Sequence, residues 1–526
     1  MNSNFDFLFN YLEKEEIPFD KSEFLFQVQS HPQYPNILSI ADTLSFFNIE
    51  NGVIEVAISD IELLPDSFIT FLKEGADNVK AFFVTKKDGY YHCSYERKTK
   101  ILDINELKAL WSGIVFLVEK SENEFETKAK KNTFWWLKLL IFFCLFAIIL
   151  YCFSPNFQSF LFFIFPILGL VFSLAALKDL FDTKSELLDN FCNMTAATSC
   201  TDVLGSTKWK IFKFFSFGDL SVVFFSTQFV GFLLFIFRLN ETLFFDLQKI
   251  LLLCSVPVLF TSIYYQKFVE KKWCPICLII IGVFLLEIIY VEIRHRSSFN
   301  FHIHSFIIFA FTFTLVSTCW FILKQLLLKL KSLKEFQIKG NRFMRNYEIF
   351  KNNLVASQAI QSIPFQSQET IILGNPDAIL KIIVVTSPFC GFCKVVHEVI
   401  EEIIDKYSEK VCFQIYFNFN NNSNDNESKM IHHKLMSIYF NQGSKVFMKA
   451  LGDWYNKKNE IKIIGDSVIN SNLNLDLILE KQFEWCQLNG INYTPAIIIR
   501  GYLLPKQYDK KDLIYFINDL SEDHEF

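Results

Sequence analysis

The sequence predicts a multidomain membrane protein: an α-helical transmembrane bundle of five or six spans, flanked by an N-terminal α+β domain and a C-terminal α/β domain. The chain has 526 residues, of which 51% are hydrophobic and 63 are Phe. Its apolar residues are concentrated between about 134 and 330, whereas both ends have the mixed composition of soluble domains. Of three pairs of closely spaced cysteines, two lie outside the apolar stretches and one lies at the start of such a stretch. The formal net charge of -5 gives no reason to expect a nucleic-acid partner.

Six apolar runs predict the membrane bundle. They cover 134–153, 158–177, 217–237, 247–265, 273–291 and 305–323. Most approach the roughly 20 residues that a helix needs to cross the hydrocarbon core of a bilayer. A buried helix of a soluble protein would explain any single run, but six in succession favour a membrane domain over 134–328. The first two runs are joined by only four residues, as in a helical hairpin, so the count stays at five or six.

The start of the chain does not resemble a secretory signal. It reads MNSNFDFLFNYLEKEE, with acidic residues where a signal peptide has a basic end and an apolar core. We therefore expect residues 1–125 to be a folded domain of the mature protein.

The cysteine pairs are arranged by the topology of the spans. The pairs are Cys192 with Cys200, Cys274 with Cys277, and Cys390 with Cys393. Two spans separate the loop 178–216, which holds the first pair, from the motif WCPIC that opens the fifth run. Two further spans lead to the C-terminal domain, so parity places all three pairs on one face of the membrane.

Zinc binding is the competing use of such pairs. Structural zinc sites bring four ligands together, commonly from one small domain. WCPIC has no histidine nearby, and SPFCGFC has only His397 within one or two helical turns. We therefore predict redox chemistry and no metal site.

The C-terminal pair lies at a strand-to-helix junction. ILKIIVV is typical of a buried strand, and CKVVHEVIEEIIDKY has the periodicity of an amphipathic helix. Cys390 at the helix start would be stabilised as a thiolate by unpaired backbone N–H groups, and Cys393, one turn later, suits the resolving role. About a hundred residues further on, Thr494 and Pro495 precede another strand and a Gly turn.

This combination resembles the thioredoxin fold over roughly 370–520. The resemblance implies that Pro495 is cis and lies against the redox pair, with Thr494 and Pro495 contacting the substrate. The segment 419–485 looks like the helical insertion of periplasmic disulfide oxidants.

The membrane part resembles the vitamin K epoxide reductase family in its bacterial form, fused to a thioredoxin-like domain. The residues that carry the resemblance are the loop cysteines eight positions apart, Ser206 six positions after the second of them, and WCPIC at the start of a later span. The chain departs from the family in its span count, since five or fewer are usual. It also lacks the Tyr that some members place four residues after the second Cys of the motif.

The resemblance implies a quinone-linked thiol–disulfide relay. Cys390–Cys393 would oxidise a substrate protein, Cys192–Cys200 would reoxidise that pair, and Cys274–Cys277 would take the electrons next. Cys277 would then reduce a quinone, menaquinone or ubiquinone, held within the bundle. Ser206 would bind near the quinone, although an ordinary surface serine explains it almost as well.

Residues 1–125 resemble the papain-like peptidase domain that clips double-glycine leaders at bacterial peptide exporters. The resemblance rests on HPQYPNILSIADTLSFFNIENGVIEVAISDIELLPDSFITFL, AFFVTKKDGYYHC and LWSGIVFLVE. Such a peptidase needs an early Cys nucleophile and an activating His. The first cysteine here is Cys93, and neither His31 nor His92 has a candidate nucleophile upstream. We predict a degenerate copy without peptidase activity that binds a peptide or partner, or serves as a scaffold.

The charges near the membrane conflict with the family resemblance. Lysines gather on the face that carries the cysteine pairs, whereas the opposite face has only Arg238, Arg294 and Arg296. The positive-inside rule would place the pairs in the cytoplasm, where thiols are kept reduced. The resemblance implies the oxidising periplasm, which we favour because a dithiol oxidase has little use in a reducing compartment.

The sequence thus predicts a multi-pass protein of the bacterial inner (cytoplasmic) membrane that introduces disulfides into exported proteins. The predicted domains are 1–125, 134–328 and a thioredoxin-like 370–526, with 329–369 as linker. Expected partners are reduced exported proteins or a thioredoxin-like protein, membrane lipid, and a peptide for the N-terminal domain. Two alternatives stay open: a thiol reductase that carries electrons outward, and a peptide-binding accessory of export, which would have no motor because no phosphate-binding Gly loop is present.

Overall fold

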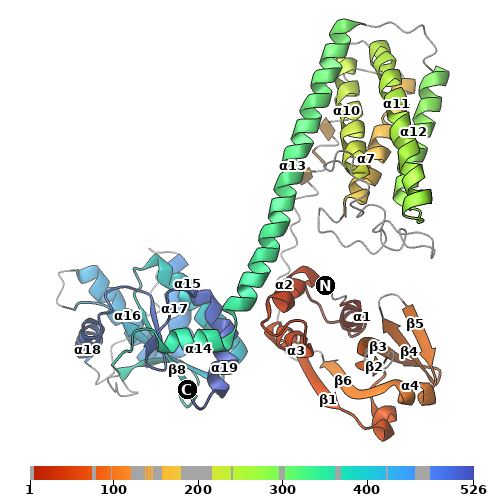
Figure 1. Cartoon of the computed structure of the whole chain (residues 1–526). Coiled ribbons are helices and arrows are strands. Elements are labelled where there is room, and N and C mark those ends of the chain that lie inside the picture. The colour runs from red at the N-terminus through yellow and green to blue at the C-terminus, as the bar shows by residue number, and fades with distance from the viewer. Residues whose placement is uncertain are drawn as a thin grey trace. The chain divides into compact units, whose positions relative to one another are not determined.

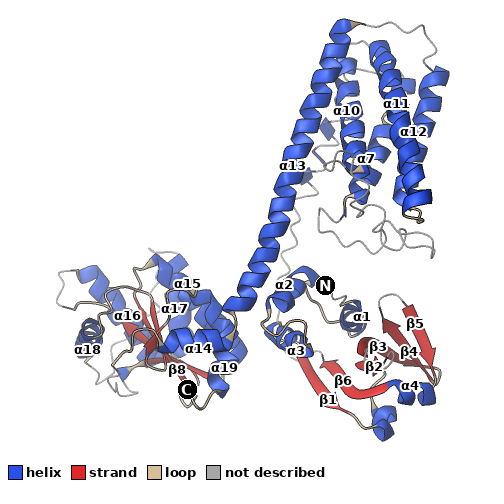
Figure 2. Cartoon of the chain, viewed as in Figure 1, coloured by secondary structure: helices blue, strands red, loops and turns tan. Residues whose placement is uncertain are grey.

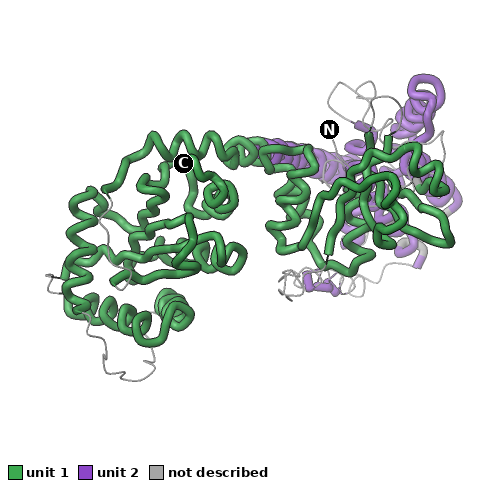
Figure 3. Tube along the Cα trace, turned by 90° about the horizontal axis from the view of Figure 1, so that it is seen from below, with its two compact units in different colours: residues 1–129, 337–526 green, residues 130–336 purple. Residues whose placement is uncertain are grey.

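The structure is a computed structural model with two compact units, residues 1–129 with 337–526 and residues 130–336 (Figures 1 and 3). Each unit is described by itself. Apart from a few scattered positions between 137 and 148, the described residues are 5–73, 79–95, 98–119, 157–178, 216–237, 241–294, 302–361, 369–421, 425–456 and 474–526.

The N-terminal domain has the predicted α+β architecture. Three helices, α1 (Asp6–Lys14), α2 (Lys21–Ser30) and α3 (Ile37–Phe46), precede a six-stranded antiparallel sheet in the order β1-β6-β2-β3-β4-β5 (Figure 2). The strands are β1 (Glu50–Glu55), β2 (Ser67–Lys73), β3 (Val79–Lys87), β4 (Tyr90–Tyr95), β5 (Lys98–Leu102) and β6 (Trp111–Glu119). The helices and the strand residues Ile69, Phe83 and Phe116 share one apolar core. A second core includes Ile61 of the short helix η1 (Ile58–Leu63) and Leu107 of α4 (Ile104–Leu110). The resemblance to papain-like peptidases stays a prediction.

Cys93 does not supply the missing peptidase nucleophile. Its side chain on β4 is wholly buried, and burial raises its pKa to about 12. His31 instead lies 3.1 Å from the carboxylate of Asp42.

Among the described residues, four helices are long and apolar enough to cross a membrane: Phe217–Phe237, Thr242–Val269, Pro275–Ile293 and Ile303–Met344. They correspond to α10 (Phe217–Phe237), α11 (Glu241–Tyr264) with η4 (Tyr265–Val269), α12 (Pro275–Arg294) and α13 (Ile303–Met344). A shorter apolar segment, α6 (Phe157–Phe162) with α7 (Ile164–Ala176), packs into the same bundle. Most of the first predicted run lies outside the described residues, so five or six spans stays a prediction.

Aromatic rings fill the interior of the bundle. Phe162, Phe225 and Phe232 are almost wholly buried, and Phe224 packs on Phe284 with ring centroids 4.3 Å apart. Gly169 on α7 allows this packing, since a Cβ there would lie 2.4 Å from the ring of Phe225. The close approach of α7 to α10 therefore depends on a residue without a side chain.

A buried charge joins the start of α10 to α13. The Asp219 side chain is 1% exposed, and Lys324 Nζ lies 2.5 Å from its Oδ2. Trp320 Nε1 donates to Oδ1 over 3.1 Å, and Ser216 Oγ donates to Oδ2 over 2.7 Å. Because every polar contact of the carboxylate comes from a donor, the charge is well compensated away from water.

The segment 329–369, predicted as a linker, is largely helical where it is described. It contains the end of α13 and α14 (Tyr347–Val355). Phe350 and Leu354 are wholly buried in the core of the C-terminal domain, and Phe350 stacks on Phe516 with centroids 4.0 Å apart. The packed C-terminal domain therefore begins before residue 370.

The C-terminal domain has a five-stranded sheet in the order β11-β10-β8-β9-β7. The strands are β7 (Ile371–Gly374), β8 (Leu380–Thr386), β9 (Val411–Phe417), β10 (Ala496–Ile499) and β11 (Tyr502–Leu503). Only the β8–β9 pair is parallel. The helices are α15 (Gly391–Tyr407), α16 (Asn426–Gln442), α17 (Ser444–Asn456), α18 (Leu475–Leu488), η6 (Lys510–Phe516) and α19 (Ile517–Glu522). Helices α16 to α18 lie between β9 and β10 in the chain, where the helical insertion was predicted.

We expect Lys324→Met to destabilise the bundle more than Asp219→Asn. The first change leaves a carboxylate uncompensated in a buried position, whereas Lys324 is 23% exposed and can reach water after the second. Removing one member of a buried pair costs on the order of 3 kcal/mol or more, and the double variant should recover much of that loss. Thermal unfolding in detergent measures the difference. Lys329→Met, at an exposed position of the same helix, is the matched control; equal losses in all three single variants would contradict the role of the pair.

Candidate redox sites

The first site lies where β8 passes into α15. The strand ends at Thr386, and Cys390 is the residue immediately before the first turn of α15. The Cys390 N–H donates to Ser387 O over 3.1 Å, and the Cys393 N–H donates to Cys390 O over the same distance. Cys390 is partly exposed and Cys393 is wholly buried. The geometry therefore separates an accessible sulfur from a protected one.

The Thr494–Pro495 segment lies beside this pair, as the sequence predicted. Its peptide bond is cis, and the Cys390 thiol donates to Thr494 O over 3.3 Å. The antiparallel pairing of Ala496 with Val385 brings the start of β10 next to the end of β8. The contact with Cys390 is thus a consequence of strand register; the role of Thr494 and Pro495 in substrate binding stays a prediction.

The two thiols differ in acidity. Burial alone would raise the pKa of Cys390, but hydrogen bonds with Thr494 and Cys393 and with backbone N–H groups at the start of α15 hold it below the ordinary value for a thiol. Burial raises the pKa of Cys393 to about 11. Since the thiolate is the attacking species, this difference is the one that the predicted roles require, with Cys390 as the nucleophile and Cys393 as the resolving thiol.

Helix α17 holds the loop in front of Cys390, a contact that sequence reasoning missed. Trp454 Nε1 donates to Pro388 O over 2.8 Å, and Tyr455 OH donates to Ser387 O over 3.1 Å. Both donors lie more than 60 residues from their acceptors. No local sequence signal points to this contact, because an aromatic residue in an amphipathic helix is ordinarily a core residue.

A buried histidine lies one turn beyond Cys393. His397 Nε2 is 3.0 Å from Thr386 Oγ1, and Nδ1 has no partner among the described residues. Burial lowers its pKa to about 4, so the ring is neutral at physiological pH. It is therefore part of the neutral packing beneath the pair.

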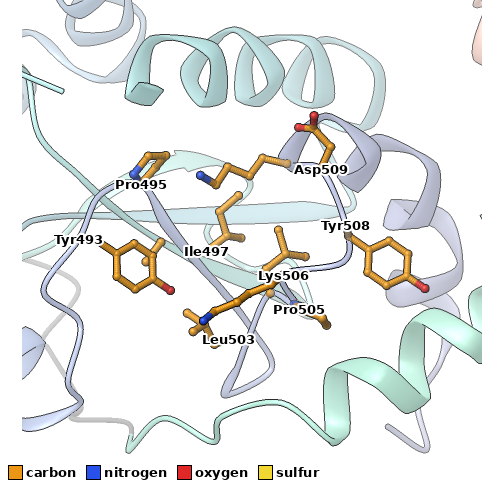
Figure 4. Close-up of a pocket in the computed structure, with 11 residues that line it drawn as sticks. Tyr493, Pro495, Ile497, Leu503, Pro505, Lys506, Tyr508 and Asp509 are labelled. Carbon is orange, nitrogen blue, oxygen red and sulfur yellow. The ribbon is translucent and has the colours of Figure 1, made fainter. Parts of the chain in front are cut away.

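The surface around Cys390 is apolar. Phe389, Phe392 and Tyr493 are 42%, 78% and 45% exposed. A pocket beside Pro495 continues this surface, with Ile497 and Leu503 among its apolar lining residues. Figure 4 shows Lys506 extending across it, with Tyr493 at one end and Tyr508 at the other. Such a surface suits an unfolded or flexible polypeptide segment that presents a cysteine.

The second site lies at the start of α12. Cys274 comes just before Pro275, the first residue of the helix, a position that proline favours. Cys274 and Cys277 are 0% and 2% exposed. The Cys277 N–H donates to Cys274 Sγ over 3.3 Å, and the Cys274 N–H donates to Gln266 Oε1 over 2.9 Å. Gln266, in the π-helical segment η4, positions the pair and was not predicted from sequence.

Cys192, Cys200 and Ser206 lie outside the described residues. Among the residues that are described, no group of three or more His, Cys, Asp or Glu side chains could hold a metal ion.

Two dithiol sites at helix starts, one in a soluble domain and one in a membrane bundle, define a membrane thiol–disulfide oxidoreductase. Comparison with family models specifies it further: residues 160–292 match the vitamin K epoxide reductase family and residues 366–519 match a thioredoxin model. The bundle is therefore similar to the vitamin K epoxide reductase family over residues 160–292 and the C-terminal domain is thioredoxin-like, which confirms both resemblances. Comparison with curated proteins found no match.

Solved structures similar to the chain include oxidised BdbD from Bacillus subtilis, which is 14% identical and matches over 31% of this chain and 99% of that one, with a TM-score of 0.24. A periplasmic thioredoxin-like protein from Salmonella enterica serovar Typhimurium is 17% identical, with the same coverages and TM-score. The thiol-disulfide exchange protein α-DsbA2 from Wolbachia pipientis is 16% identical over 33% of this chain and 92% of that one, with a TM-score of 0.23. At these scores the likenesses carry no weight for function.

Alkylation of the reduced protein should separate Cys390 from Cys393. At pH 7 we expect Cys390 to react on the order of a hundredfold faster, because its pKa is held below the ordinary value for a thiol, whereas burial raises the pKa of Cys393 to about 11 and shields its sulfur. Mass spectrometry of the two peptides over time measures the ratio. In Cys390→Ser the slow rate of Cys393 should persist; comparable rates in the wild type would contradict the assignment.

The C-terminal domain should lose stability as the pH falls from about 6.5 to about 4. His397 and His432 are buried with pKa values of about 4 against an ordinary 6.5, both mainly because of burial. In that window the unfolded chain binds protons that the folded domain does not, which lowers the free energy of unfolding by about 3 kcal/mol per histidine. Hydrogen-exchange protection of the β8 and β9 amides measures it in the full chain. The double variant His397→Gln/His432→Gln should show a much flatter pH dependence; an unchanged slope would contradict the prediction.

Proposed function

We propose that the protein generates disulfides in exported proteins and passes their electrons through three cysteine pairs to a quinone. The observation that carries the proposal is the nucleophilic, partly exposed Cys390 in the same chain as a buried Cys274–Cys277 pair. One dithiol is placed to meet protein substrates and the other is enclosed in a membrane bundle. Two dithiols in these different surroundings suit electron transfer from a polypeptide to a lipid-soluble acceptor.

In the first exchange, a substrate thiolate attacks Cys390 of the oxidised Cys390–Cys393 pair, and Cys393 leaves. The second substrate thiol attacks the resulting mixed disulfide, which gives an oxidised substrate and a reduced Cys390–Cys393 pair. Two electrons and two protons have then moved from the substrate to the domain. The low pKa of Cys390 makes it both a good leaving group here and a good nucleophile in the next step.

In the second exchange, Cys390 attacks Cys192 of the Cys192–Cys200 disulfide, and Cys393 resolves the bond. The freed Cys200 then attacks Cys274, and Cys192 resolves that mixed disulfide. Cys274–Cys277 is left reduced, so the same two electrons now lie in the membrane domain. We assign the exchange with the loop to Cys274 because it precedes the helix, whereas Cys277 lies within it.

The surroundings of Cys277 fit a quinone. The residue belongs to an apolar cluster that includes Ile280, Ile281 and Phe284, which offers an aliphatic and aromatic wall for a ring. Menaquinone or ubiquinone bound there would accept two electrons and two protons. Cys277, with Ser206, is the residue that we assign to this site, and we place the thioredoxin-like domain in the periplasm of an inner-membrane protein.

Replacement of Cys277 by Ser should abolish quinone reduction while the oxidised C-terminal domain still oxidises one equivalent of substrate. The reason is that Cys277 belongs to the membrane pair, which receives electrons only after the C-terminal domain has oxidised its substrate. Steady-state quinone reduction and single-turnover peptide oxidation in the same preparation measure the two steps. Undiminished quinone reduction would rule the assignment out, and wild-type protein that reduces substrate disulfides at the expense of quinol would reverse the direction.

Replacement of Cys393 by Ala should trap the bond between Cys390 and Cys192, because the resolving thiol is gone. A protease site introduced between residues 361 and 369 then allows the two parts to be separated. The fragments should stay joined until a reductant is added, and they should separate in controls that also lack Cys192 or Cys390. Free separation in the Cys393→Ala protein, under conditions where the wild type turns over, would mean that the domains do not exchange disulfides.

A further inference from the structure

Three polar side chains meet in the interior of the bundle, away from both cysteines. They are Gln228 on α10, Gln248 on α11 and Glu287 on α12, and each is 0% exposed. Gln248 Nε2 donates to Glu287 Oε1 over 2.7 Å, and Gln228 Nε2 donates to the same oxygen. Three helices thus converge on one carboxyl group.

The cluster has more acceptors than donors. Glu287 Oε2, Gln228 Oε1 and Gln248 Oε1 are buried and have no partner among the described residues. All three unpartnered atoms are oxygens that accept hydrogen bonds, and both amide groups already donate to Oε1. A single proton on Oε2 would turn one of these acceptors into a donor within the cluster.

No positive charge offsets a carboxylate at this place. Glu287 forms no ion pair with any described residue. Between residues 157 and 328, the described charged or titratable side chains on the helices of the bundle, other than Glu287, are Asp219, Asp246, Lys249, Cys254, Tyr264, Tyr265, Lys267, Cys277, Tyr290, Glu292, His304, Cys319 and Lys324. Asp219 and Lys324 pair with each other, and helix α7 carries no charged residue. An unpaired charge in the apolar interior of a membrane bundle is costly, whereas a neutral acid is not.

We propose that Gln228, Gln248 and Glu287 form a proton-binding site inside the bundle. The role that we assign to this site rests on the proposed function: Glu287 donates a proton to the acceptor during electron transfer from Cys274–Cys277. Oxidation of the two thiols to a disulfide releases two electrons and two protons, and the acceptor takes up two of each. Glu287 gives up one proton to the acceptor and regains one from the thiols, so the balance closes without another reactant.

Glu287 lies too far from Cys277 for direct proton transfer, so the bound acceptor or water molecules would have to connect the two. It lies ten residues after Cys277 on the same helix, a rise of about 15 Å. Phe284 lies between the two on α12 and packs against Phe224 and Phe225 of α10. Protons from the helix start therefore have a polar receiver deeper in the bundle, behind an aromatic layer.

Infrared spectroscopy of the full-length protein in lipid tests the site without requiring turnover. The wild type should show the C=O stretch of a buried protonated carboxylic acid at neutral pH, shifted in heavy water. The band should be lost in Glu287→Gln, which keeps the shape of the side chain, and retained in the control Glu292→Gln at an exposed position of α12. A wild type without the band, or a Glu287→Gln protein that keeps it, would overturn the site.

Quinone reduction tests the role. Glu287→Gln should slow steady-state quinone reduction by about a hundredfold, as expected for the loss of a proton donor, and Glu287→Asp should restore part of the rate. Single-turnover oxidation of a peptide by the C-terminal domain should be unchanged in both variants. Wild-type quinone reduction in Glu287→Gln would overturn the role in proton transfer. A wild type that reduces no quinone would instead refute the proposed function, while the infrared result would still decide whether the site exists.

Discussion

The pairing of β10 with β8 is the constraint on which the soluble redox site depends. It sets the register that carries Thr494 to the sulfur of Cys390, while β8 itself delivers the chain to the start of α15. The backbone N–H groups at the start of α15, the contact with Thr494 and the partial exposure then all act on the sulfur of Cys390. If the register slipped by one residue, β10 would turn its buried face outward and the Thr494–Pro495 segment would no longer lie beside Cys390. The acidity of the thiol is therefore a property of the sheet as much as of the CxxC motif.

The two described cysteine pairs have the same position at the start of a helix but lie in different surroundings. In each, the first cysteine stands immediately before a helix and the second lies within its first turn. Cys390 faces water and exposed aromatic side chains, whereas Cys274 is enclosed by the bundle and by Gln266. Burial restricts which partner can reach each sulfur. In the relay that we propose, the surroundings of each pair, and not the motif, thus decide which partner it can meet.

Much of this arrangement was predictable because its signals are local. The apolar runs, the spacing of the CxxC motifs and the Thr494–Pro495 dipeptide are short-range patterns with direct physical meaning. The contacts of Trp454, Tyr455 and Gln266 were not predictable, because they join segments whose proximity only the fold creates. The segment predicted as a linker contributes to the packed C-terminal domain, and this was not predictable for a related reason. In the sequence, Phe350 and Leu354 resemble any apolar residues of a polar helix, and only the fold shows the core in which they are buried. The loop pair and its serine lie outside the described residues, so their roles stay predictions.

The absence of a side chain at Gly169 has a consequence for how this bundle can vary among related sequences. The ring of Phe225 occupies the space that a methyl group would need, and the same ring packs on Phe284 of the helix that carries Cys277. A larger residue at 169 could be accommodated only together with a smaller one at 225, which would in turn leave Phe284 without its neighbour. These three positions should therefore change as a set across related proteins. Their covariation would record the packing of the redox helix even where the cysteines themselves never vary.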